Sequence, residues 1–313
     1  MGNRGPRAVL VVMVAMVAAL ALAACAQPGD EPAQTDALDD DAITIGSFNF
    51  AESVLLAEIY GQALEHAGLT VERAFQLGPR EFVAPALAVG LIELVPEYAG
   101  SAATFLHRGE TAPSSDVETT YERLIAGLRG SAVTALTPSR AQNANAFVVA
   151  RSTAAEAGLR DLSDVSDFDG ELIFGGPPEC QRRALCLVGL EQVYGIEFDA
   201  DKVVALRAGA LIEQALRDGG IDIGLLFTSD AAMLSGDFVE LRDDRGLQPA
   251  ENITPLVRNE VLERWGDDVV ASVDAVSARL TTVRLRLLNA EVAGDTTRVA
   301  AIAAAWLTEQ GLT

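Results

Sequence analysis

The sequence is poor in the residues that most often carry out chemistry. Its 313 residues include two histidines and three cysteines, and only 5% are aromatic. The 23 lysines and arginines are outnumbered by 45 acidic residues, which gives a net charge of −22. A protein of this sign repels a phosphate backbone, so nucleic acid is excluded as a partner.

Catalytic motifs are missing as well. The chain has no G-x-S-x-G elbow, H-E-x-x-H, P-loop or complete G-x-G-x-x-G. GGPPEC (175–180) is rich in glycine but lacks the lysine of a phosphate loop. The isolated His66 and His107 offer little as a catalytic base or as metal ligands. We therefore expect no enzyme activity, no cofactor and no metal.

The first 24 residues have the build of an export signal. Arg4 and Arg7 precede an uncharged apolar segment, residues 8–24, like the core of a signal peptide. It runs into LAAC (22–25), which resembles the bacterial lipobox, whose cysteine is lipidated and begins the mature protein. We expect a signal peptide over 1–24, a lipid on Cys25 and a flexible acidic tether over 25–42. The alternative is a single membrane-spanning helix.

From Ile43 onward, segments of strand and helix length alternate. Residues 43–47, 69–75 and 91–95 are typical of strands, and 51–68 and 79–90 of helices that end at glycine. This alternation predicts an α/β fold with mainly parallel sheets and right-handed crossovers. The chain length predicts about two domains.

A short pattern occurs twice. ALAVGLIEL (86–94) and ALRDGGIDI (215–223) both follow A-L-x-x-G-x-I-acid-aliphatic. Each copy predicts a helix that ends at glycine and leads into a buried strand. Two similar α/β lobes would explain the repeat, although such junctions are common enough for chance to remain the alternative.

Polar and aromatic residues follow three of the predicted strands. In open parallel sheets, ligands bind at the carboxyl ends of strands, where loops and helix N-termini meet. These residues are therefore candidates for a shared site: Ser47, Phe48 and Asn49; Pro96, Glu97 and Tyr98; and Phe227, Thr228, Ser229 and Asp230. We expect Ser47, Asn49, Thr228 and Ser229 to supply hydrogen bonds to the ligand.

Five segments, in order and spacing, resemble the substrate-binding proteins of osmoprotectant ABC importers, which take up glycine betaine, choline, carnitine or proline betaine. They are GSFNFAES, QLGPREFVAPAL, GLIELVPEYAG, GGPPECQRRALCLVGLEQVYG and FTSD. The resemblance implies a type II periplasmic-binding-protein fold of two lobes, each a mixed, mainly parallel sheet flanked by helices, with two crossover strands as hinge. Lobe 1 would comprise 43–143 and 251–313, and lobe 2 would comprise 144–250.

The resemblance also implies how the ligand is held. A quaternary ammonium has no N–H to donate, so aromatic ring faces attract it instead. Tyr98 matches a family ring, Phe227 stands where the family often has tyrosine, and Phe48 replaces a family lysine. Arg183 aligns with an arginine suited to a ligand carboxylate, and Ala146 falls where the family has a further tyrosine.

Two cysteines remain once Cys25 is assigned to the lipobox. Cys180 and Cys186 favour a disulfide, because exported proteins oxidise paired cysteines. A metal site is the less favoured alternative. Arg183 lies inside the loop, so the bridge would either fix this arginine or act only as a staple.

We therefore expect a monomeric, lipid-anchored receptor on the extracytoplasmic face of the cell membrane. It would capture a small quaternary amine such as glycine betaine or choline between two closing lobes and deliver it to an ABC permease and its ATPase. Two alternatives stay open: a non-quaternary aromatic or polyol solute, and a lipoprotein receptor that is not coupled to import.

Overall fold

The computed structural model describes residues 41–108, 114–207 and 209–313. The predicted signal peptide (1–24), the predicted lipidation site Cys25 and all but the last two residues of the predicted tether (25–42) lie outside these ranges. Within the described ranges, no helix is long and apolar enough to cross a membrane.

Two mixed sheets of five strands form the framework, which confirms the predicted α/β fold. In each sheet three parallel strands are followed by two antiparallel steps. The first sheet has the order β2 (Thr70–Ala74), β1 (Ala42–Gly46), β3 (Leu94–Tyr98), β10 (Ile253–Arg258), β4 (Val133–Ala135). The second has the order β7 (Val203–Ala205), β6 (Phe174–Gly176), β8 (Ile223–Phe227), β5 (Asn145–Ala150), β9 (Phe238–Glu240).

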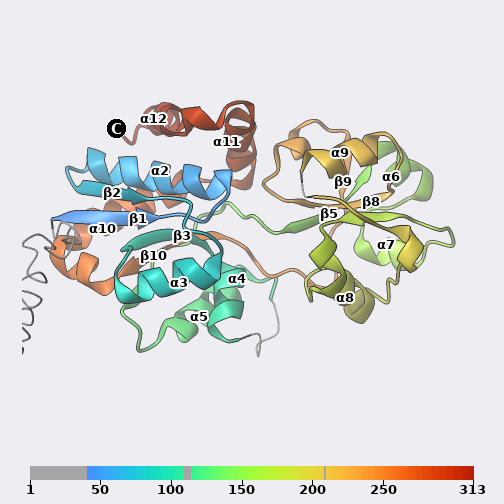
Figure 1. Ribbon diagram of the computed structural model, residues 1–313, viewed down its shortest axis with the longest axis horizontal. Coiled ribbons are helices and arrows are strands. Elements are labelled where there is room, and N and C mark those ends of the chain that lie inside the picture. The colour runs from blue at the N-terminus through green and yellow to red at the C-terminus, as the bar shows by residue number, and fades with distance from the viewer. Residues whose placement is uncertain (1–40, 109–113, 208) are drawn as a thin grey trace, which may run out of the picture. The chain divides into compact units, whose positions relative to one another are not determined.

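Helices cover both faces of the first sheet. Figure 1 shows α2 and α12 on one side of this sheet and α3, α4 and α5 on the other. The helices of this lobe are α2 (Ala51–His66), α3 (Arg80–Val89), α4 (Ala99–Leu106), α5 (Val117–Leu128), α10 (Asn259–Arg279), α11 (Thr282–Gly294) and α12 (Val299–Gln310), with the 3₁₀ turn η5 (Thr296–Arg298). Gly266 has a non-helical backbone (φ 48°) and kinks α10.

The second sheet carries shorter helices. Figure 1 shows α9 on one side and α7 and α8 on the other. The elements are α6 (Arg151–Ala157), α7 (Leu162–Ser166), α8 (Leu187–Gly189) and α9 (Ala210–Arg217), the 3₁₀ turns η1 (Pro178–Arg182), η3 (Ala200–Lys202) and η4 (Ala231–Leu234), and a π turn η2 (Leu190–Tyr194).

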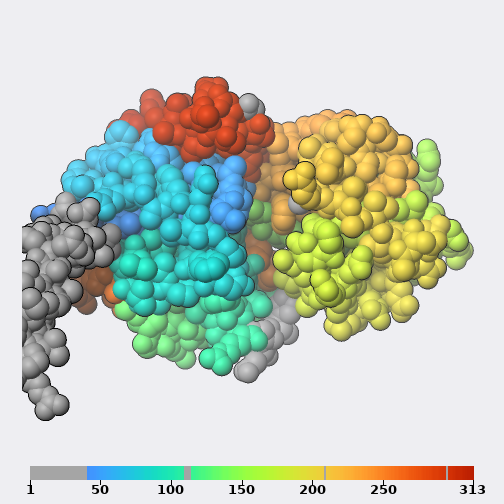
Figure 2. Space-filling view, in the orientation of Figure 1, coloured from blue at the N-terminus to red at the C-terminus, as the bar shows by residue number. Residues whose placement is uncertain are grey.

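The C-terminal helices pack on the N-terminal part of the chain. One apolar core joins β1 and α2 to α10, α11 and α12, and Trp306 is buried in it. Figure 2 shows the C-terminal segment lying directly on the N-terminal part of this lobe. The second sheet has two separate apolar cores, one on each side. The apolar residues packed against each sheet thus form their own clusters.

Two neighbouring segments connect the sheets. The first leads from Ala141 into β5, and the second leads from Glu251 into β10. They run antiparallel, because the Asn143 N–H donates to the Glu251 carbonyl (3.0 Å) and the Ile253 N–H donates to the Ala141 carbonyl (2.9 Å). We call them the crossover segments.

The structure corrects one boundary. The sequence predicts a strand over 91–95 that ends before Pro96, but β3 runs from Leu94 through Pro96 to Tyr98. Pro96 lies opposite Pro255 of β10 in the antiparallel pair. Proline lacks the N–H of a sheet ladder, and the two prolines concentrate this loss at one pair of residues. Pro96 and Glu97 therefore lie within the strand, and Tyr98 is its last residue.

The sequence repeat has the same structural role in both sheets. Both copies end in the middle strand of a sheet, β3 or β8. The acidic residue accepts a backbone N–H from the neighbouring strand or the residue just before it: Thr44 of β1 donates to Glu93 (3.0 Å), and Ile173, before β6, donates to Asp222 (2.8 Å). The isoleucine before it packs onto a glycine of that strand, so a Cβ there would come within 2.5 Å of it at Gly46 and 2.4 Å at Gly175. The pattern thus encodes one way of joining a helix to a middle strand.

Gly100, on α4, provides a test of the close packing of this helix against the chain before the second crossover segment. A Cβ at Gly100 would lie 2.6 Å from Pro249 Cβ and 2.9 Å from the Ala250 carbonyl, both rigid neighbours. We expect Gly100→Ala to lower the free energy of unfolding by about 1–3 kcal/mol, because overpacking must move the backbone before the second crossover segment. Urea unfolding measures the change. Gly220→Ala is the matched control, since its nearest atom would lie 3.6 Å away; equal stability of the two variants would contradict the steric argument.

Candidate ligand-binding site

Three aromatic rings meet where the first sheet ends. Phe48 follows β1, Phe50 precedes α2 and Tyr98 ends β3. Their ring centroids are 5.8 Å (Phe48–Phe50), 6.2 Å (Phe48–Tyr98) and 6.0 Å (Phe50–Tyr98) apart. These separations are close to the roughly 6 Å over which an aromatic ring attracts a cation that lies over its face. We call these three residues the aromatic cluster.

The cluster is partly open to solvent. Phe48 and Tyr98 are buried, whereas Phe50 is 42% exposed. The Phe50 ring therefore extends the two buried rings to the surface at the end of the sheet. The sequence predicted Phe48 and Tyr98 but not Phe50, although Phe50 lies in the same motif, GSFNFAES.

A buried carboxylate anchors the cluster. The Tyr98 hydroxyl donates to Glu52 Oε1 (2.8 Å), and the Asn143 amide donates to the same oxygen (2.7 Å). The Asn289 amide donates to Glu52 Oε2 (2.5 Å) and also to the Ser229 carbonyl (3.0 Å). Burial and the adjacent Glu52 charge hold the pKa of Tyr98 well above its ordinary value, so Tyr98 stays a hydrogen-bond donor.

Glu52 differs from the other buried glutamates of the described residues. Three of these are paired with arginine: Glu58 with Arg73 (2.8 Å), Glu93 with Arg264 (2.7 Å) and Glu97 with Arg80 (2.8 Å). Glu251 is the fourth and is described below. Glu52 forms no ion pair within the described part of the chain, and its three hydrogen-bond donors are neutral. Buried carboxylates are normally paired, so Glu52 is an exception that points to a site.

Arg80 contacts Phe48 and Glu97. Its guanidinium is 5.3 Å from the Phe48 ring centroid and binds Glu97 through Nε (2.8 Å) and Nη2 (2.9 Å). Glu97 Oε2 also accepts the Tyr98 N–H (2.8 Å). Glu97 and Tyr98 are thus held by separate partners, Arg80 for the carboxylate and Glu52 for the ring hydroxyl.

The predicted hydrogen-bonding residues mostly bind the backbone. The buried Ser47 hydroxyl donates to the Phe48 carbonyl (3.0 Å) and accepts the Gln76 N–H (2.8 Å). The Thr228 hydroxyl accepts the Ala144 N–H (3.0 Å) and donates to the Gln142 carbonyl (3.1 Å). Asn49 is exposed. The Ser47 and Thr228 side chains therefore hold loops and a crossover segment in place.

The predicted residues after β8 lie close to α11. Arg286 of α11 donates from Nε to the Thr228 carbonyl (2.5 Å), and Asn289 reaches the carbonyl of the buried Ser229. Phe227 is half-buried, and no ring pair in the described residues includes it. The structure thus links Ser229 to Glu52 through Asn289, a residue that no local sequence pattern indicates.

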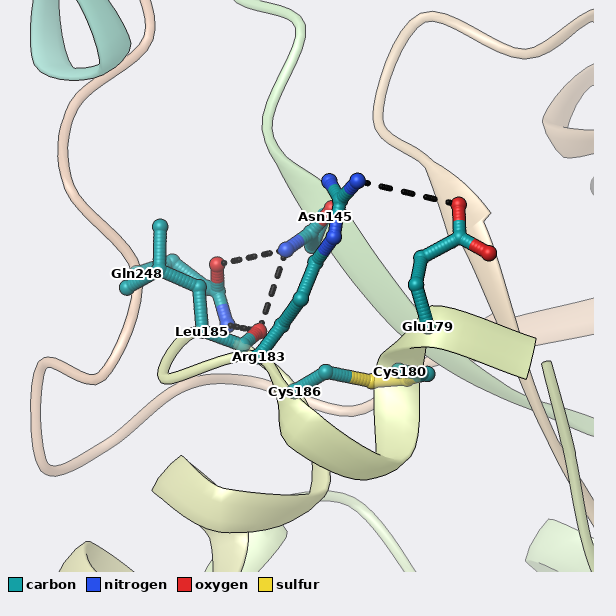
Figure 3. The surroundings of a disulfide bond; sticks show 7 residues. All are labelled: Asn145, Glu179, Cys180, Arg183, Leu185, Cys186 and Gln248. Carbon is teal, nitrogen blue, oxygen red and sulfur yellow. Dashed lines mark hydrogen bonds and ion pairs between the residues drawn. A yellow bond between two sulfur atoms is a disulfide. The ribbon is translucent and has the colours of Figure 1, made fainter. Parts of the chain in front are cut away.

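The predicted arginine lies beside a disulfide. Cys180 and Cys186 are bonded, with Cα atoms 5.3 Å apart, and Arg183 lies in the loop between them (Figure 3). The Leu185 carbonyl accepts hydrogen bonds from Asn145 (3.0 Å) and Gln248 (2.9 Å), which ties the loop to β5 and to the chain before β10. The Arg183 side chain is 69% exposed and lies 3.7 Å from Glu179. The loop is fixed, and the guanidinium faces solvent.

The described residues contain no group of three or more histidine, cysteine or acidic side chains arranged to hold a metal ion.

The class of protein follows from the fold and the site. The structure has two similar sheets, two crossover segments and an aromatic cluster at the end of one sheet, which together define a solute-binding protein of the two-lobed type.

Comparison with known proteins assigns the family. Residues 41–309 match the substrate-binding domain of ABC-type glycine betaine transport systems, and the chain belongs to this family. Members of this family bind a small solute for the permease and ATPase of an ABC importer, outside the cytoplasm, and are not enzymes. The predicted family is therefore confirmed.

Individual relatives agree. The chain is 27% identical to the glycine betaine-binding protein YehZ of Escherichia coli (strain K12), over 87% of this chain and 91% of that protein. It is 26% identical to a glycine-betaine-binding protein of Pseudomonas aeruginosa, over 87% and 89% of the two chains.

Solved structures confirm the predicted two-lobed fold. The structure of apo YehZ from Escherichia coli superposes with a TM-score of 0.72, at 26% identity, over 87% of this chain and 99% of that one. A structure described as a glycine betaine/carnitine/choline ABC transporter gives 0.77 at 21% identity, over 86% and 99% of the two chains.

Glu251, at the start of the second crossover segment, provides a pH test. It is buried and accepts bonds from the Ser101 N–H (3.0 Å) and hydroxyl (2.5 Å). Burial outweighs these bonds and raises the pKa of Glu251 from 4.5 to about 7. The folded state therefore holds this proton more tightly than the unfolded chain, and its contribution to stability is lost as the pH rises from about 4.5 to about 7.

Between pH 5 and pH 8, we expect the free energy of unfolding to fall further in the wild type than in Glu251→Gln. The difference should be about 2–3 kcal/mol, since one pKa unit corresponds to about 1.4 kcal/mol. Urea unfolding at the two pH values measures this difference. Glu118→Gln, an exposed position on α5, controls for the loss of one negative charge. If Glu251→Gln keeps the wild-type pH dependence, the buried carboxyl is not its source.

Proposed function

We propose that this chain captures a small quaternary ammonium solute outside the cytoplasm and delivers it to an ABC permease and its ATPase. The aromatic cluster carries the proposal, because three neighbouring rings suit a cationic group that cannot donate hydrogen bonds. Membership of a glycine betaine transport family supports it. The relatives named for glycine betaine binding agree with this class of solute.

The remaining features of the receptor are part of the same proposal. The lobes, 43–143 with 251–313 and 144–250, close on the solute about the crossover segments. A lipid on Cys25 anchors a monomeric protein to the membrane. Aromatic rings line the site: Phe48 and Tyr98 of the aromatic cluster, and Phe227. Arg183 binds the carboxylate of a betaine. Ser47, Asn49, Thr228 and Ser229 remain predicted hydrogen-bond partners.

The aromatic cluster is tested at Tyr98. We expect Tyr98→Ala to weaken choline or glycine betaine binding at least about tenfold, because one desolvated cation–π contact contributes about 1–2 kcal/mol. Isothermal titration calorimetry measures the affinity, and a thermal melt verifies folding. Tyr98→Phe keeps the ring and should lose less, and Phe82→Ala, an exposed ring on α3, should change nothing. Unchanged affinity in Tyr98→Ala would remove this ring from the site.

The role of Arg183 is tested by comparing two ligands. Choline and glycine betaine share a trimethylammonium group, but only glycine betaine has a carboxylate for a guanidinium to bind. We therefore expect Arg183→Ala to weaken glycine betaine at least several-fold and choline much less, as measured by calorimetry. Arg182→Ala is the neighbouring exposed control. Equal losses of affinity for both ligands in Arg183→Ala would refute the proposal that Arg183 binds the ligand carboxylate.

A further inference from the structure

The aromatic cluster borders a buried carboxylate that no basic side chain in the described residues pairs with. Tyr98, Asn143 and Asn289 satisfy the oxygens of Glu52 with neutral donors, at 2.8, 2.7 and 2.5 Å. Neutral donors satisfy the hydrogen bonds of a carboxylate but do not cancel its charge. A cation held over the Tyr98 ring would lie beside this charge and compensate it at short range.

The arginines around the cluster are already engaged. Arg80 binds Glu97 through two nitrogens, at 2.8 and 2.9 Å. Arg286 binds the Thr228 carbonyl and lies 3.6 Å from Glu240. The half-buried Asp230, which follows Ser229, is a further acidic group that interacts electrostatically with Glu52. The charge around the cluster therefore favours a cation and opposes an additional anion.

Asn143 offers a second, independent indication. Its amide nitrogen must face Glu52, because the alternative orientation would turn the amide oxygen toward a carboxylate. The Asn143 Oδ1 that faces the other way is buried and accepts no hydrogen bond within the described residues. A buried acceptor without a donor is costly. A ligand hydroxyl can donate to it, whereas a ligand carboxylate cannot.

We propose that Glu52 provides the counter-charge for the ligand's ammonium group and that Asn143 accepts a ligand hydroxyl, so that the site favours choline-like cations over zwitterionic betaines. This inference rests on the proposed function and narrows its ligand class. The opposing attraction of Arg183 for a carboxylate is weak by comparison, because its side chain is 69% exposed and solvent screens its charge.

A ligand series on the wild-type chain tests the proposal without any variant. Calorimetry at pH 7.5 and fixed salt would compare choline, tetramethylammonium and glycine betaine, which share the methylated ammonium group. We expect choline to bind at least tenfold more tightly than glycine betaine. Tetramethylammonium, which has the charge without the hydroxyl, should fall between them. Glycine betaine binding as tightly as choline would overturn the proposal.

Variants then assign the effect to residues. Glu52→Gln keeps the size and an acceptor oxygen but removes the charge. We expect the affinity for choline to fall at least tenfold and the affinity for glycine betaine to fall less, so that the ratio of the two affinities becomes smaller. Asn143→Ala should bring choline close to tetramethylammonium. Glu58→Gln is the matched control, since Glu58 is buried on the same helix but paired with Arg73, and it should leave the ratio unchanged.

The outcomes separate this inference from the proposed function. If the wild type binds none of the three ammonium ligands, the proposed function fails. If it binds them but Glu52→Gln weakens choline and glycine betaine equally, only the role of Glu52 as counter-charge fails. Thermal melts of each variant show whether a lost affinity reflects a lost fold.

Discussion

The Glu52 carboxylate is the interaction on which the site depends. It lies on α2 and accepts hydrogen bonds from β3 through Tyr98, from the first crossover segment through Asn143, and from α11 through Asn289. Asn289 continues the network to the Ser229 carbonyl after β8. Four segments far apart in the sequence are thus positioned around one buried charge. Because hydrogen bonds to a charged group are shorter and stronger than neutral ones, this arrangement holds the Tyr98 ring firmly in place.

The two sheets explain why these segments meet. β3 and β8 occupy the same middle place in their sheets, and each pairs antiparallel with a strand that follows a crossover segment. The carboxyl end of β3 therefore lies beside the start of β10, and the carboxyl end of β8 beside the start of β5. The residues at both ends are next to the segments that join the lobes. A ligand that contacts Tyr98 is then close to the part of the chain that must bend if the lobes move.

How far the sequence predicts the site depends on the distance along the chain between partners. The helix–glycine–strand repeat predicted two similar lobes, because each copy is a local packing unit of isoleucine, glycine and an acidic residue. Phe48 and Tyr98 were predicted because each follows an apolar run. Phe50 and Glu52 lie in the same motif as Phe48, so a signal was present, but alternation alone does not tell which side chain turns toward Tyr98.

Partners far along the chain could not be predicted in this way. Asn289 lies 237 positions from Glu52, and nothing in α11 distinguishes it locally. The end of β3 was misplaced for the same reason, since its register is set by β10, more than 150 residues later. The position of the Arg183 side chain was also open: the disulfide fixes the backbone of its loop, but a long side chain can still extend to solvent.

The charge of the whole chain and the charge of the site act over different distances. A net charge of −22 attracts cations to the protein surface. At physiological ionic strength, however, exposed charges are screened beyond about 8 Å, so the overall charge raises the encounter rate of any cation and selects little among them. Glu52 is buried, where screening is weaker and water does not compete for its oxygens. Discrimination between a cation and a zwitterion with the same headgroup must therefore come from this carboxylate and its immediate neighbours rather than from the acidic surface.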